Sequence, residues 1–113
     1  MNHRIYEKDG ISVLELKGTI TLGSGDVTLR SLVKDMLGQG RKQIVVDLGG
    51  VSFMDSTGLG ELVAAYTTAR HQQATIKLVN LTKKINDLLS ITQLAAVFET
   101  YGTMDEGLAS FKS

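Results

Sequence analysis

The chain has 113 residues, of which 42% are hydrophobic and 21% are charged, and its formal net charge at pH 7 is zero. This composition predicts one soluble globular domain over residues 1–113, and the neutral charge gives no support for binding to nucleic acid or to an anionic membrane. The absence of cysteine excludes thiol catalysis, disulfides and cysteine-based zinc sites. Charged residues or glycine interrupt every apolar run, so we expect a cytoplasmic protein with no membrane insertion.

Hydrophobic periodicity and turn residues divide the chain into strands and helices. Asp9-Gly10 supplies the two positive φ values of a type I′ turn and predicts a hairpin. Asp26 is of a residue type that begins helices, and Gly38 is of one that ends them. In chain order, the predicted elements are strands at 3–8 and 11–17, a short strand within 18–25, a helix at 26–38, a strand at 43–48, a helix at 57–71, a strand at 75–79, a short helix after Thr82, a strand at 96–100 and a helix after Thr103.

This alternation predicts the α/β class, with one mixed β-sheet covered by about four α-helices and the hairpin at one edge. The helix at 57–71 has two different faces. The face predicted to be buried carries Leu59, Leu62, Val63, Tyr66 and Arg70. The opposite face is small and barely charged, with Gly60, Glu61, Ala64, Ala65 and Thr68. Either ordinary helix propensity explains this second face, or it is a flat docking surface.

The segment between the strand at 43–48 and the following helix places Asp55, Ser56 and Thr57 at a helix N-terminus. Backbone N–H groups there lack intrahelical partners and the helix dipole is positive, so a phosphate would be tolerated. Ser56 therefore fits both an N-cap and a regulatory phosphorylation site, and these roles are compatible. Alternatively, Asp55 caps the helix and leaves Ser56 available.

The same segment gives little support to an enzyme. An aspartic protease needs two Asp-Thr/Ser-Gly copies, whereas here an extra residue separates Asp55 from Gly58 and no second copy exists. A dinucleotide fingerprint would need a third glycine where the chain has Val63. A hydrolase that uses Ser56 and His71 would have to bridge about 20 Å of helix. We therefore expect no catalytic residue and no metal site.

The residues that carry a resemblance to a known family lie in this region. They are Val45-Val46-Asp47-Leu48, Val51 and the run from Phe53 to Gly60, and similar runs follow at 85–89 and 94–98. Nearly the whole chain resembles the STAS domain family, in its anti-sigma-factor-antagonist branch. The resemblance implies a single STAS-like domain with a mixed sheet, four helices and no catalytic activity of its own.

The resemblance also implies partners. In the family, the unphosphorylated antagonist binds an anti-sigma factor that is also a serine kinase, which releases the sigma factor. A serine phosphatase then resets the phosphorylated antagonist. ATP belongs to the kinase, so no cofactor is expected on this chain. The alternative within the same fold is a STAS subunit without a switch, working as a scaffold in a signalling or lipid-transport assembly.

By this resemblance, Ser56 matches the phosphorylated serine and Asp55 the preceding aspartate, which helps partner recognition or phosphorylation. The chain departs from the family after its second strand, where Thr21 stands in place of the common acidic residue and Asp26 is the nearest replacement. The expected partner-binding residues are Thr21, Asp26, Asp55, Ser56, Thr57, Gly58, Gly60, Glu61 and Ala64.

Overall fold

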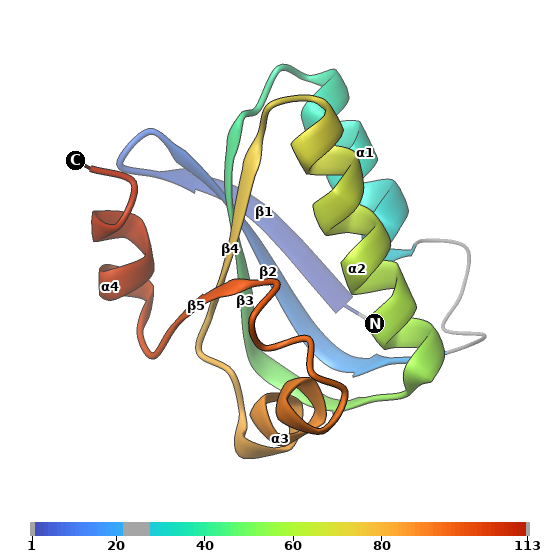
Figure 1. The fold of residues 1–113 in the computed structure, drawn as a ribbon. Helices are drawn as coiled ribbons and strands as arrows, with labels where there is room; N and C mark the ends of the chain where they lie inside the picture. Colours follow the sequence, from blue (N-terminus) through green and yellow to red (C-terminus); the bar gives the residue numbers. More distant parts are fainter. Residues whose placement is uncertain (1, 22–27, 113) are drawn as a thin grey trace.

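The computed structural model describes residues 2–21 and 28–112 of the chain (Figure 1). Strands and helices alternate along most of it, as predicted. The elements are β1 (Asn2–Lys8), β2 (Ile11–Ile20), α1 (Leu29–Gly38), β3 (Gln43–Met54), α2 (Ser56–His71), β4 (Thr75–Val79), α3 (Lys83–Ile91), β5 (Glu99–Tyr101) and α4 (Met104–Ala109). The predicted α/β class is confirmed.

The five strands form one mixed sheet in the order β1-β2-β3-β4-β5. The first two strands are antiparallel, and every other neighbouring pair is parallel. Asp9 and Gly10 have φ values of 55° and 78°, as a type I′ turn requires. The predicted hairpin at one edge of the sheet is therefore confirmed.

Helices cover both faces of the sheet. Figure 1 shows α1 and α2 side by side on one face and α4 on the other, with α3 at the end of the sheet where β3 and β4 finish. Leu14, Val46 and Leu78 belong to the larger core under α1 and α2, whereas Val45 and Val79 belong to a smaller core with α4. Because both faces are covered, Ile44, Val45, Val46 and Leu48 of β3 are all buried, whereas Gln43 is exposed and Asp47 is half-buried.

Several predicted boundaries are wrong. Helix α1 begins at Leu29 and not near Asp26, because Thr28 is its N-cap: the Ser31 N–H donates to Thr28 Oγ1 and the Thr28 N–H donates to Ser31 Oγ. Residues 18–20 continue β2 instead of forming a separate strand. The last strand is confined to Glu99–Tyr101, since the chain still turns at residues 95–97.

The predicted faces of α2 also need correction. Ala65 was placed on the outer face, but it is 1% exposed and belongs to the larger core. Helix α2 packs against α1 as well as against the sheet, so its buried stripe is wider than a single sheet contact requires. Arg70 was placed on the buried face but is exposed, and its guanidinium lies 5.8 Å from the ring centre of Tyr66.

Candidate functional site

Asp55 is the N-cap of α2. It has the extended backbone of a cap residue, and its Oδ1 accepts a hydrogen bond of 2.8 Å from the Gly58 N–H. The Asp55 N–H in turn donates to the Ile20 carbonyl at 3.3 Å, which ties the start of α2 to the end of β2. Of the two capping alternatives that the sequence leaves open, the structure has the one in which Asp55 caps the helix.

Ser56 is consequently the first residue of α2, and its side chain is exposed beside that of Thr57. Within the described part of the chain, Ser56 Oγ makes no hydrogen bond. The backbone N–H groups of Ser56 and Thr57 belong to the first turn, where no intrahelical acceptor exists. The hydroxyl is thus presented to solvent at the positive end of a sixteen-residue helix.

The outer side of α2 continues from these residues through Gly60, Glu61 and Ala64. Gly60 is exposed, with no atom within 4 Å of the position that a Cβ would take. Glu61 and Ala64 are half-buried. Glu61 Oε2 is buried and has no hydrogen-bond partner among the described residues. The five residues from Ser56 to Ala64 on this side form a continuous strip, which we call the α2 strip.

Gly58 differs from the other predicted site residues because it is buried. A Cβ on Gly58 would lie 2.0 Å from the Ile20 carbonyl oxygen. The absence of a side chain therefore lets α2 begin directly against the end of β2. Gly58 positions the site from within the chain and does not itself reach the surface.

Thr21 also lies at this end of the sheet. The parallel register pairs Ile20 with Met54, the last residues of β2 and β3, so the residues that follow them, Thr21 and Asp55, are neighbours. Both are half-buried at the carboxyl ends of parallel strands, the usual position of functional sites in α/β folds. Asp26, the other predicted residue of this loop, lies outside the described residues.

An apolar hollow beside the helix start was not predicted. It has a volume of ≈ 310 Å³, and its rim includes Phe53, Leu88 and Ile91. Phe53 is 49% exposed and Ile91 is 80% exposed. The pairing of β2 with β3 shifts between Gly18 and Thr19, and this bulge interrupts the alternation that starts from the buried Val51 and leaves Phe53 exposed. We call this hollow the Phe53 groove.

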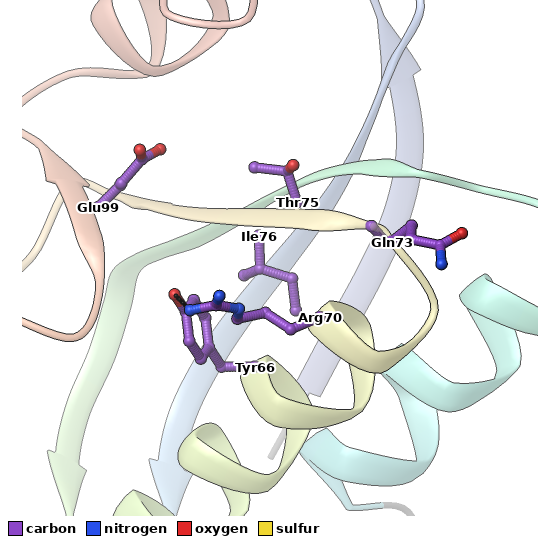
Figure 2. A pocket seen from close by; sticks show the side chains of 7 residues that line it. Tyr66, Arg70, Gln73, Thr75, Ile76 and Glu99 are labelled. Carbon is purple, nitrogen blue, oxygen red and sulfur yellow. Dashed lines mark hydrogen bonds between the residues drawn. The ribbon is translucent and has the colours of Figure 1, made fainter.

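A second hollow lies at the other end of α2 (Figure 2). It has a volume of ≈ 320 Å³ and is lined by Tyr66, Arg70, Gln73, Glu99 and nearby residues of β4. Arg70 folds back toward Tyr66, and its Nη1 lies 3.4 Å from the Tyr66 hydroxyl oxygen. Arg70 is about 20 Å along the helix from Ser56, so this hollow is separate from the α2 strip.

Residues 2–21 and 28–112 contain neither a cluster of metal-ligating side chains nor a membrane-spanning helix. No group of three His, Asp or Glu side chains in these ranges is arranged to hold a metal ion. None of the helices there is both long enough and apolar enough to cross a membrane.

Comparison with known proteins identifies the family. The sequence pattern of the STAS domain matches residues 2–107. The chain belongs to the STAS domain family. The anti-sigma-B factor antagonist of Bacillus subtilis (strain 168) is 30% identical over 108 residues, which cover 96% of this chain and 97% of that protein. The antagonist of the same name from Listeria monocytogenes is 41% identical over 54 residues, 48% of this chain and 47% of that protein, so the match spans about half of that relative.

Solved structures have the same fold. An anti-sigma factor antagonist from Mycobacterium paratuberculosis superposes with a TM-score of 0.87 at 23% identity, covering 99% of this chain and 94% of that one. The Bacillus cell fate determinant SpoIIAA in its phosphorylated form has a TM-score of 0.71 at 16% identity, covering 98% and 100%. STAS proteins of this kind are regulatory binding proteins, and the chain is assigned to them and not to the enzymes.

Proposed function

We propose that this chain is an anti-sigma-factor antagonist switched by phosphorylation of Ser56. In its unmodified form it binds an anti-sigma factor that is also a serine kinase, and the sigma factor is released. Phosphorylation of Ser56 ends that binding, and a serine phosphatase restores it. ATP is held by the kinase, the chain needs no cofactor of its own, and the exchange takes place in the cytoplasm.

The observation that supports this proposal is the exposed Ser56 hydroxyl at the first position of α2. Since Asp55 supplies the cap, Ser56 is not needed to satisfy the helix N-terminus. A phosphate on Ser56 would lie beside N–H groups without intrahelical partners, which favours an anion there. The relatives from Listeria monocytogenes and Bacillus subtilis are both named anti-sigma-B factor antagonists, which adds support to the proposal.

The proposed binding surface combines the α2 strip with Thr21 and the Phe53 groove. The strip is nearly flat because Gly60 and Ala64 are small, so a partner backbone can approach α2 closely. The groove adds exposed apolar area next to the strip, and apolar anchors supply most of the binding energy in many interfaces. Asp26 stays a predicted contact of the loop that precedes α1.

The test uses a serine kinase of the anti-sigma type with ATP, and the variants Ser56→Ala and Thr57→Ala. We expect Ser56→Ala to remove all phosphate measured by intact mass, and Thr57→Ala to leave it nearly unchanged. Thr57 is the matched control because it is exposed in the same helical turn. Undiminished phosphate on Ser56→Ala would overturn the site. If the protein binds its partner but carries no phosphate under any cellular condition, the scaffold alternative is favoured.

A further inference from the structure

Strand β1 forms one edge of the sheet, and its outer side has no neighbouring strand in the part of the chain that the structure describes. All seven residues, Asn2–Lys8, pair with β2 without a break in register. The strand contains no proline, and the bulges lie in the pairing between β2 and β3. Natural edge strands use proline, bulges or charged side chains to prevent pairing with another strand, and of these β1 has only charged side chains, Arg4, Glu7 and Lys8, which leave its backbone groups accessible. This edge is therefore open to a further strand.

The backbone groups available on this side follow from the hairpin. Lys8 and Ile11 close the Asp9-Gly10 turn and form a hydrogen-bonded pair. Such pairs alternate with non-hydrogen-bonded pairs along an antiparallel ladder. Counting back from Lys8, the N–H and C=O groups of His3, Ile5 and Glu7 therefore point away from β2. Three residues thus present a regular row of donors and acceptors.

The side chains of β1 are complementary to a second copy of the same strand. In an antiparallel pair centred on Ile5, that residue faces its own copy, His3 faces Glu7, and Arg4 faces Tyr6. No pair brings like charges together, and the His3–Glu7 pair is attractive when the imidazole is protonated. Moving the centre by one residue places Arg4 opposite Arg4 or opposite Lys8, and both pairs are repulsive. The strand therefore favours one register.

The residues at the centre are already arranged for this contact. Ile5 is 37% exposed and lies at the sheet edge, so a second copy would remove apolar surface from water. Arg4 is held by an ion pair of 3.3 Å with Glu15 and by its position 4.7 Å from the Tyr6 ring centre. The Arg4 side chain is 65% exposed, so its guanidinium is accessible to Tyr6 of a second copy.

From these observations we propose that two copies of this chain associate through β1, antiparallel about Ile5, to form one continuous sheet. This interface is independent of the function proposed for Ser56. The contact is a single strand from each copy and is smaller than a standard interface, so we expect a weak dimer with a Kd on the order of 100 µM.

The first experiment is sedimentation equilibrium of the unmodified chain and of two lysine variants up to about 1 mM, ten times the expected Kd. Ile5→Lys places two lysines face to face and should raise the Kd by at least about tenfold. Val97→Lys is the matched control because Val97 is 39% exposed but lies away from β1, and it should dimerise like the unmodified chain. A chain that stays monomeric throughout this range overturns the proposal, as does equal weakening by both variants.

The second experiment uses the absence of cysteine from the chain. Cα atoms of a hydrogen-bonded antiparallel pair are about 5.5 Å apart, within the range that a disulfide spans. Ile5→Cys should therefore form a disulfide-linked dimer under mild oxidation, far faster than Val97→Cys at the same concentration. This result supports the register even if Ile5→Lys fails to fold. Equal rates for the two cysteine variants would show random collision and would overturn the register.

Discussion

Gly58 and Gly60 lie two residues apart in α2, yet their surroundings are opposite. A Cβ on Gly58 would meet the Ile20 carbonyl oxygen at 2.0 Å, whereas a Cβ on Gly60 would meet nothing within 4 Å. Gly58→Ala should lower the free energy of unfolding by about 1–3 kcal/mol, because backbone must move. Gly60→Ala should raise it by about 0.5–1 kcal/mol, because alanine is the better helix former. Urea unfolding of both variants measures these changes, and equal effects would contradict the packing described here.

The environment of Glu61 also lowers the free energy of unfolding. Its Oε2 is buried without a hydrogen-bond partner among the described residues, which typically costs about 1–3 kcal/mol. Glu61→Ala should leave the free energy of unfolding unchanged or higher, while binding to the anti-sigma partner weakens. Urea unfolding and a binding titration test the two parts separately. A clear loss of stability would mean that the carboxylate contributes to the fold and is not held for a partner.

Sequence reasoning could not choose between Asp55 and Ser56 as the cap, because both residue types cap helices about equally well. The choice depends on where β3 ends, and its length is set by pairing with β2 up to Ile20 and Met54. This pairing joins residues that are far apart in the sequence, so the local pattern around Asp55 does not predict it. The helix start itself was predicted to within one residue.

At the scale of elements, α4 is attached to the sheet by a lysine that hydrophobic patterning does not predict. Lys77 lies in β4 with its side chain 9% exposed, and its Nζ donates to the carbonyl oxygen and to Oγ of Ser110 at 3.1 and 2.9 Å. It also lies 3.2 Å from Glu99 Oε2 and 4.3 Å from the Phe111 ring centre. The buried ammonium is accommodated because several groups surround it.

Replacing this lysine should loosen α4 in particular. Lys77→Met keeps the apolar stem but removes the hydrogen bonds to Ser110, at a cost of roughly 1–3 kcal/mol. We expect faster amide hydrogen exchange in α4 than in α1, because only α4 loses its attachment. Lys34→Met, at an exposed position of α1, is the matched control. Unchanged exchange in α4 would mean that Leu108 and its apolar neighbours hold the helix without Lys77.

At the scale of the whole molecule, the α/β class followed from alternating periodicity, because strands covered on both faces read as continuous apolar runs. Surface features were harder to predict. The Phe53 groove depends on a bulge near Gly18 and on the position of α3, two features that are far apart in the sequence. The burial of Ala65 depends on α1 lying beside α2. The groove that was not predicted and the wrong placement of Ala65 both arise where two elements meet and not within an element.

The proposed switch should act on the partner and leave the fold intact. A phosphate on Ser56 adds about −1.5 to −2 charges at pH 7, and at a helix N-terminus such a charge is favourable by about 0.3–1 kcal/mol. The Asp55 carboxylate opposes this gain by repulsion, so the melting temperature should stay within a few degrees of the unmodified protein. In the partner interface the same charge would be desolvated at a cost of several kcal/mol, and each 1.4 kcal/mol is about a tenfold loss of affinity.

Thermal unfolding and partner titration of the unmodified and phosphorylated proteins test this separation of effects. We expect nearly equal melting temperatures and a large loss of affinity on phosphorylation. Ser56→Asp should reproduce part of the loss, because aspartate has one charge and fewer acceptor oxygens than a phosphate. Thr57→Asp is the matched control, since it adds the same charge to the same exposed turn one residue away. A large fall in melting temperature on phosphorylation would mean that the modification rearranges the domain. The proposal that the phosphate acts only through its charge in the partner interface would then be wrong, even with Ser56 as the modified residue.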